Sequence, residues 1–125
     1  MGLVEKQWEF LQDVAKLIEY AKGLGFIVTA GEMYRPIEMQ RLYIETGRSK
    51  TMNSKHLSRL AVDLNFFIRD KKGRLQLTWS REKIKPLGEF WEELNPKNRW
   101  GGSWRGLIEA GKSKFVDVPH FERAS

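Results

Sequence analysis

Leu60-Ala61-Val62-Asp63-Leu64-Asn65-Phe66-Phe67-Ile68 has the alternation of a β-strand with two different faces. Side chains of a strand point alternately to opposite sides, so the apolar residues at even positions share one face. Asp63 lies at the centre of the other face. A carboxylate in the middle of a strand is costly to bury unless it is paired or bound to a metal. The pattern therefore predicts a core strand that directs one carboxylate toward a site.

The rest of the chain predicts helices and shorter strands around this one. Residues 3–22 are expected to form a helix, with an apolar stripe of Val4, Trp8, Leu11, Ala15 and Ile18 that Phe10, Val14 and Leu17 widen. Further helices are predicted over 36–46 and 81–94, and further strands over 26–30, 74–78 and 115–118, with a turn at 70–73. This order predicts an α+β fold with a small, mainly antiparallel sheet, in a single domain spanning 1–125.

Composition excludes several classes of protein. The chain has 125 residues, 41% of them hydrophobic and 30% charged, which is typical of a folded domain of ordinary size. It has no cysteine, so a metal site would have to use nitrogen and oxygen ligands. No apolar run approaches the length of a membrane span. The N-terminal residues lack the pattern of a signal peptide, so we expect synthesis in the cytoplasm.

The net charge of +6 favours an anionic partner, such as nucleic acid, a membrane surface or an acidic cell-wall polymer. The basic residues are scattered along the chain and form no dense block with interleaved aromatic residues. A nucleic-acid binder would explain the charge but not the histidine and aspartate pattern described next. We therefore expect no nucleic-acid partner.

The chain contains two histidines, His56 and His120. Taken alone, each is more often an incidental surface histidine than a ligand. Together with Asp63, seven residues after His56, they form a standard ligand set for a catalytic zinc with one position left for water. Asp117 precedes His120 by three residues, and Pro119 between them could bend the chain so that both face one cleft. A carboxylate beside a zinc site is suited to proton transfer in peptide hydrolysis.

Four segments resemble one family, in the family's order. The stretch Ser54-Lys55-His56-Leu57-Ser58-Arg59-Leu60-Ala61-Val62-Asp63 resembles the SxHxxGxAxD motif of the zinc D-Ala-D-Ala carboxypeptidase and L-alanyl-D-glutamate endopeptidase family. Asp117-Val118-Pro119-His120 is similar to its second motif, an acidic residue followed by histidine at the third position. Trp100-Gly101-Gly102-Ser103-Trp104 is similar to the WGG-x-W stretch of short, phage-type members, and Tyr34-Arg35 with Gln40 resembles the family's YR…Q segment.

The resemblance implies a role for each matched residue. His56, Asp63 and His120 would bind one zinc ion per chain. Asp117 would be the general base and acid, and Arg35 would hold the carbonyl oxygen as it gains charge in the tetrahedral intermediate.

Other matched positions are open to two interpretations. Ser54 is a candidate for substrate binding or a turn former, and Trp100 and Trp104 could line the cleft or pack in the core. Gln40 could equally be a residue of a helix face and is left out of the site. Two positions depart from the family, because Arg59 stands at the usual glycine and Ser103 stands where short members often carry aspartate.

The resemblance implies the hedgehog/DD-peptidase fold, with helices packed on one face of the sheet. It also implies hydrolysis of an amide bond in peptidoglycan stem peptides. We expect the protein to be a phage or prophage endolysin that acts as a monomer and cuts the L-Ala–D-Glu bond. It would reach the cell wall through a holin-type lesion, and the anionic polymers of the wall would attract it. The alternatives are D-Ala-D-Ala carboxypeptidase activity and a non-catalytic, zinc-containing wall-binding module. Retention of Asp117 and Arg35 argues against the module.

Overall fold

A five-stranded sheet forms the centre of the molecule, in a computed structural model that describes residues 1–34, 37–47 and 55–124. The helices and strands of the molecule follow one another along the chain in this order: α1 (Leu3–Gly23), β1 (Ile27–Ala30), α2 (Ile37–Glu45), the short 3-10 helix η1 (Lys55–Ser58), β2 (Ala61–Arg69), β3 (Leu75–Thr78), α3 (Arg81–Leu94), β4 (Asn98–Trp100) and β5 (His120–Arg123). These elements confirm the predicted α+β class.

The long strand β2 organises the sheet. The strand order is β1-β2-β5-β4, with β3 also paired to β2, and every described pair is antiparallel. Phe66 and Phe67 pair with both β1 and β3, so these two strands lie along opposite edges of β2. The first residues of β2 pair instead with β5, and Asp63 lies directly opposite His120. The register thus brings two of the predicted ligands together.

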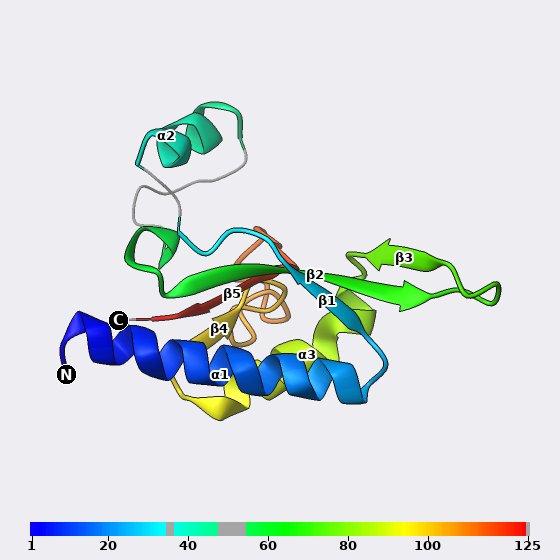
Figure 1. The fold of residues 1–125 in the computed structure, drawn as a ribbon. Helices are drawn as coiled ribbons and strands as arrows, with labels where there is room; N and C mark the ends of the chain where they lie inside the picture. The colour runs from blue at the N-terminus through cyan, green and yellow to red at the C-terminus, as the bar shows by residue number, and fades with distance from the viewer. Residues whose placement is uncertain (35–36, 48–54, 125) are drawn as a thin grey trace.

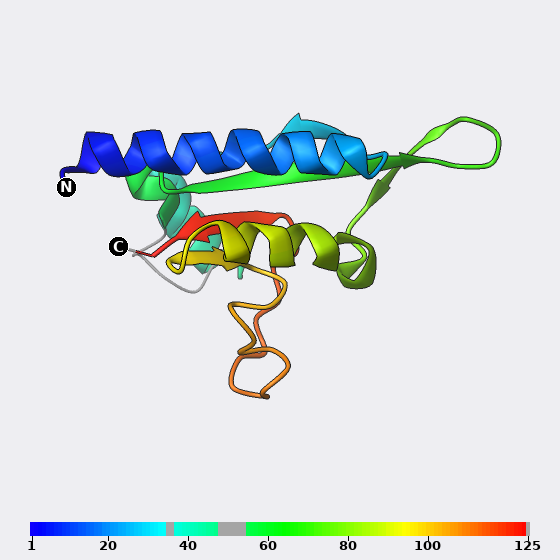
Figure 2. The same cartoon turned by 90° about the horizontal axis from the view of Figure 1, so that it is seen from below.

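Helices α1 and α3 pack on one face of the sheet, and α2 lies beyond the other (Figures 1 and 2). The even-numbered residues Val62, Leu64 and Phe66 of β2 point toward α1 and α3, as predicted, and are almost fully buried, whereas Ile68 near the end of the strand is half-buried. The hydrophobic core combines this face with residues of the two helices and of β4 and β5, namely Phe10, Val14, Leu17, Ala21, Leu60, Val62, Leu64, Phe66, Ile84, Leu87, Trp91, Trp100, Val118 and Phe121. The odd-numbered residues of β2, among them Asp63, point to the opposite face of the sheet, where the predicted metal site lies.

The five residues predicted to form the apolar stripe of α1 are exposed, whereas the three predicted to widen it, Phe10, Val14 and Leu17, are buried. Trp8 is 60% exposed and Val4 is 77% exposed, whereas the buried face passes through Phe10, Val14, Leu17 and Ala21. The reason is an ion pair that a count of apolar residues misses. Asp13 lies on the buried face, where it pairs with Arg123 of β5 and accepts a hydrogen bond from Asn98. Asp13 thus shares the buried face of α1 with the apolar residues.

The predicted strand over 115–118 is also wrong, because the last strand begins at His120. The backbone N–H of Asp117 donates to the carbonyl of Gly101 at 2.8 Å, and that of His120 donates to the carbonyl of Asp117 at 3.1 Å. These bonds make a turn, and Pro119 within it has no N–H to donate to a ladder. The structure also contains β4, whose three residues are too few to show a period in the sequence.

Candidate metal centre

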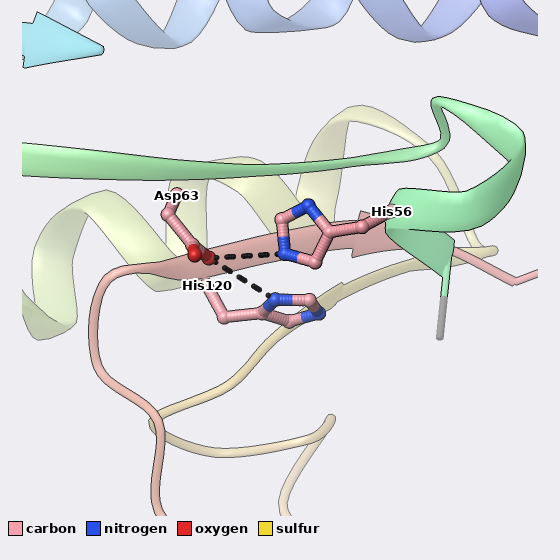
Figure 3. Close-up of side chains that lie close together, drawn as sticks. All are labelled: His56, Asp63 and His120. Atoms are coloured by element: carbon pink, nitrogen blue, oxygen red, sulfur yellow. Dashed lines mark hydrogen bonds and ion pairs between the residues drawn. The ribbon is translucent and has the colours of Figure 1, made fainter. Parts of the chain in front are cut away.

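Three elements bring the predicted ligands together on the face of the sheet opposite α1 and α3. Asp63 projects from β2, His120 is the first residue of β5, and His56 comes from η1 (Figure 3). One ligand atom of each residue lies within 4.8 Å of the others. Both histidines are almost fully buried, at 1% and 6% exposure. The structure therefore assembles all three residues into one compact cluster.

Both imidazoles turn one nitrogen toward the same carboxylate oxygen. Nε2 of His56 and Nδ1 of His120 each lie 3.3 Å from Oδ1 of Asp63. The outer nitrogens face other acceptors: Nδ1 of His56 is 3.0 Å from the carbonyl of Met33, and Nε2 of His120 is 2.7 Å from Oε1 of Glu122. Because these partners only accept, they assign the protons to the outer nitrogens. The inner nitrogens are then the atoms that would bind a cation, and without one the inner nitrogen of His120 carries a second proton toward Asp63.

The charges of the cluster are strongly coupled. Burial would raise the pKa of Asp63, but hydrogen bonds and charge interactions with His120 and His56 hold it well below its usual range. Burial would lower the pKa of His120, but Asp63 and Glu122 together raise it to about 9. In the metal-free protein, a proton on the inner nitrogen of His120 donates to the carboxylate of Asp63. A divalent cation among three nitrogen and oxygen donors would serve the same electrostatic purpose, so the donor set fits zinc.

Asp117 lies beside this cluster. Its Oδ2 is 4.0 Å from Nδ1 of His120, and its side chain is 35% exposed. The turn around Pro119 brings the two residues together, as the sequence suggested. A partly exposed carboxylate at the edge of a metal centre can exchange protons with both solvent and substrate.

Glu122 was missed by the sequence analysis. Its Oε1 contacts His120, and its other carboxylate oxygen accepts a 2.9 Å hydrogen bond from Nε of Arg99 on β4. Burial would raise the pKa of Glu122, but His120 and Arg99 lower it, so the carboxylate is ionised. The i, i+2 spacing of His120 and Glu122 in a strand was the signal that could have identified it.

The two tryptophans of the glycine-rich loop have different positions. Trp100 is fully buried, and its indole N–H donates to the carbonyl of Val118 at 2.7 Å. It packs against Gly88 and Gly102, where any Cβ would approach the indole to 2.2 Å. Trp100 therefore belongs to the core and has no surface to offer a substrate, which corrects its candidate role. Trp104 is half-buried, and its ring centroid lies 5.5 Å from that of His120.

Two further candidates, Arg35 and Ser54, lie outside the described residues. Arg59, at the family's usual glycine, has a left-handed backbone with φ of 57°, which explains why glycine is favoured there. Its guanidinium lies 4.4 Å from the ring centroid of Tyr34. Gln40, which we left out of the site, is fully buried in α2.

Two imidazoles and one carboxylate that converge in this way are a candidate site for one metal ion, with the donor set that catalytic zinc sites use. Comparison with known proteins specifies the family. The chain belongs to the D-alanyl-D-alanine carboxypeptidase family, whose sequence pattern it matches over residues 47–123. The match includes His56, Asp63, Asp117 and His120, and it confirms the resemblance noted in the sequence.

The chain is also similar to an L-alanyl-D-glutamate peptidase of Listeria phage A118, with 29% identity over 108 residues. The match covers 86% of this chain but 34% of that protein, so the chain spans about a third of the length of this relative. Among solved structures, the Serratia marcescens L-Ala D-Glu endopeptidase ChiX matches with a TM-score of 0.62 and 23% identity, over 90% of this chain and 79% of ChiX. This likeness confirms the fold. No helix within the described ranges is long and apolar enough to cross a membrane.

Proposed function

We propose that this protein is a zinc peptidase that hydrolyses an amide bond in peptidoglycan stem peptides. The observation that carries the proposal is the convergence of His56, Asp63 and His120 on one point, with the carboxylate of Asp117 at its edge. Membership of a peptidase family supports it. A wall-binding module without activity would have no use for Asp117 at this position.

The residues of the site divide the work between holding the metal and moving protons. His56 and His120 would bind zinc through Nε2 and Nδ1, with Oδ1 of Asp63 as the third ligand. When bound, zinc supplies Lewis-acid chemistry that acidifies water and polarises the scissile carbonyl. Asp117 accepts the proton of the attacking water on a carboxylate oxygen and delivers it to the leaving amine. Arg35 would stabilise the developing negative charge on the carbonyl oxygen.

The L-Ala–D-Glu bond is the first choice of substrate. The phage relative and the ChiX structure are both described as acting on this bond. The runner-up is the D-Ala–D-Ala bond, which the family description favours. As an endolysin, the protein would reach the wall through a membrane lesion and act as a monomer. Its net charge of +6 would favour adsorption to an anionic wall.

Mass spectrometry of purified peptidoglycan after digestion tests the proposal. A new N-terminal D-glutamate would establish the endopeptidase, and released D-alanine would establish the carboxypeptidase. The absence of both products with the zinc-loaded protein would refute a peptidase function. The His56→Ala variant is the control for contaminating hydrolases, and elemental analysis should find one zinc per chain in wild-type protein only.

A further inference from the structure

The sheet face that carries Asp63 continues past the metal centre as an exposed apolar surface. Phe67 lies on this face, four residues after Asp63 along β2, and pairs with Ile27 of β1 on one side and Leu77 of β3 on the other. Ile27 is 38% exposed and Leu77 is 45% exposed. Three apolar side chains therefore lie side by side across three strands.

Trp79 adds a large exposed side chain next to this surface. Thr78, the last residue of β3, pairs with Phe66 and is buried toward the core. Trp79 follows it directly and is 64% exposed. Asn65 is the next residue after Asp63 on this face of β2. We name Ile27, Phe67, Leu77 and Trp79 the apolar platform.

The platform lies within reach of a substrate bound at the metal centre. A strand rises about 3.4 Å per residue, so Asn65 is about 7 Å and Phe67 about 13 Å along β2 from Asp63. Exposed apolar patches that adjoin polar residues commonly mark interaction sites. The surface and the metal centre share one sheet face without an intervening strand, so one extended ligand could contact both.

The hairpin that carries the platform also has a positive tip. Strands β2 and β3 extend beyond the body of the molecule, as Figures 1 and 2 both show. Basic residues dominate its end: Arg69, Lys71, Lys72 and Arg74. The one acidic residue there, Asp70, accepts backbone hydrogen bonds from Lys72 and Arg74 and so serves the turn. The outward charge complements the carboxylates of the stem peptides that are attached along a glycan strand.

We propose that the apolar platform binds the glycan strand of peptidoglycan beside the stem peptide that is cleaved, a proposal that rests on the proposed function. Sugar rings present C–H faces that pack on aromatic and aliphatic side chains. In the wall polymer, L-Ala is joined through a lactyl group to a sugar, so the L-Ala–D-Glu bond is one residue from the glycan. An extended residue spans about 3.5 Å, and with the lactyl linker the sugar reaches Asn65, which lies between Asp63 and Phe67 on this face.

This geometry separates the two candidate bonds. The D-Ala–D-Ala bond lies at the far end of the stem peptide, several residues from the sugar, and its hydrolysis would leave the platform without a ligand. Contact with the glycan therefore favours the bond nearest to it and gives the polymer an advantage over free stem peptide.

The double variant Trp79→Ala/Leu77→Ser tests the platform, because both side chains are exposed and neither belongs to the metal cluster. A matched control is Trp8→Ala/Leu11→Ser on α1, where the two side chains are 60% and 46% exposed. Metal-free protein is sedimented with insoluble peptidoglycan, so that binding is measured without catalysis. We expect the platform variant to bind at least about tenfold more weakly, which corresponds to about 1.4 kcal/mol, and the control to bind as wild type.

Two further measurements identify the ligand. Glycan strands stripped of stem peptides should compete for wild-type binding, and hydrolysis of a soluble, sugar-free stem peptide should be equal in wild type and platform variant. Unchanged binding of the platform variant, or competition by stem peptides alone, would overturn the proposal. So would a wild-type dimer that the platform variant abolishes, since a second copy would then cover the surface. Weakened binding together with no hydrolysis of any stem peptide by wild type would refute the peptidase but retain the platform.

Discussion

Nε2 of His120 lies 2.7 Å from Oε1 of Glu122, two residues further along β5. Arg99 on β4 holds the other oxygen of the same carboxylate. The outer nitrogen of His120 therefore donates to a fixed, ionised acceptor, and the inner nitrogen faces Asp63. Carboxylates in this position orient a metal-binding imidazole and increase its basicity. Because Arg99 lies on β4 and Glu122 on β5, we expect the pairing of these two strands to influence how tightly the site binds a metal ion.

Glu122→Gln should weaken metal binding by about 10- to 100-fold, because the amide removes the negative charge behind the imidazole. The measurement is competition for zinc with a chromophoric chelator. Glu93→Gln, an exposed position on α3, is the control and should bind zinc as wild type. Equal zinc affinity in wild type and Glu122→Gln would remove Glu122 from the site.

The metal-free protein should lose stability as the pH rises from about 6.5 to about 9. Burial opposes the proton on His120, but Asp63 and Glu122 outweigh it and raise the pKa from 6.5 to about 9. A raised pKa in the folded state gives a contribution that is complete below the unfolded value and is lost as the pH passes the folded value. Thermal unfolding of chelator-treated protein should show Tm falling across this window.

Zinc should reverse this trend, because the metal replaces the proton on the inner nitrogen. The increase in Tm caused by excess zinc should grow between the same two pH values. In the metal-free protein, His120→Gln should flatten the fall in Tm, since the titrating group is gone. A Tm of metal-free wild type that stays constant across the window would contradict the assigned coupling.

Gly101→Ala should disturb the metal centre from outside the ligand set. A Cβ at Gly101 would lie 2.1 Å from the carbonyl oxygen of Asp117 and 3.0 Å from Cβ of His120. The backbone that positions both residues would have to move, so we expect weaker zinc binding and a lower Tm. Gly23→Ala is the control, since nothing lies within 4 Å of its added Cβ. It should leave zinc binding unchanged; equal loss in both variants would contradict this account.

The sequence predicted the sheet and the cluster of His56, Asp63 and His120 where the physical signal is local. Alternation along β2 correctly separated the core face from the face of Asp63, because burial of one face dictates a period of two. The helix over 81–94 has the observed bounds of α3, where Ser80 caps the first turn by accepting from the N–H of Lys83. Two scarce histidines and one strand carboxylate were sufficient to identify the cluster.

The failures share a different cause, which is contact between distant parts of the chain. The buried face of α1 includes Asp13, whose partner Arg123 lies 110 residues away. Trp100 lies in the core because Gly88 of α3 leaves room for its ring. The last strand starts only at His120, because the chain turns between Asp117 and His120. The N–H of Asp117 donates there to the carbonyl of Gly101, in a distant part of the chain. The sequence pattern of a single helix or strand cannot predict such contacts between distant segments.

Asp117→Asn should separate metal binding from proton transfer. Oδ2 of Asp117 is 4.0 Å from His120, close to the cluster but outside the three ligands that converge on one point. The amide keeps the size of the side chain and cannot accept the proton, so we expect unchanged zinc content and a fall in kcat of about 10²- to 10⁴-fold. Zinc content is measured by elemental analysis, and kcat on purified peptidoglycan by release of new amino termini. Asp63→Asn is the contrasting variant and should lose zinc together with activity. If Asp117→Asn lost zinc as readily as Asp63→Asn, the residue would be a ligand; if it kept full kcat, another group would carry the proton.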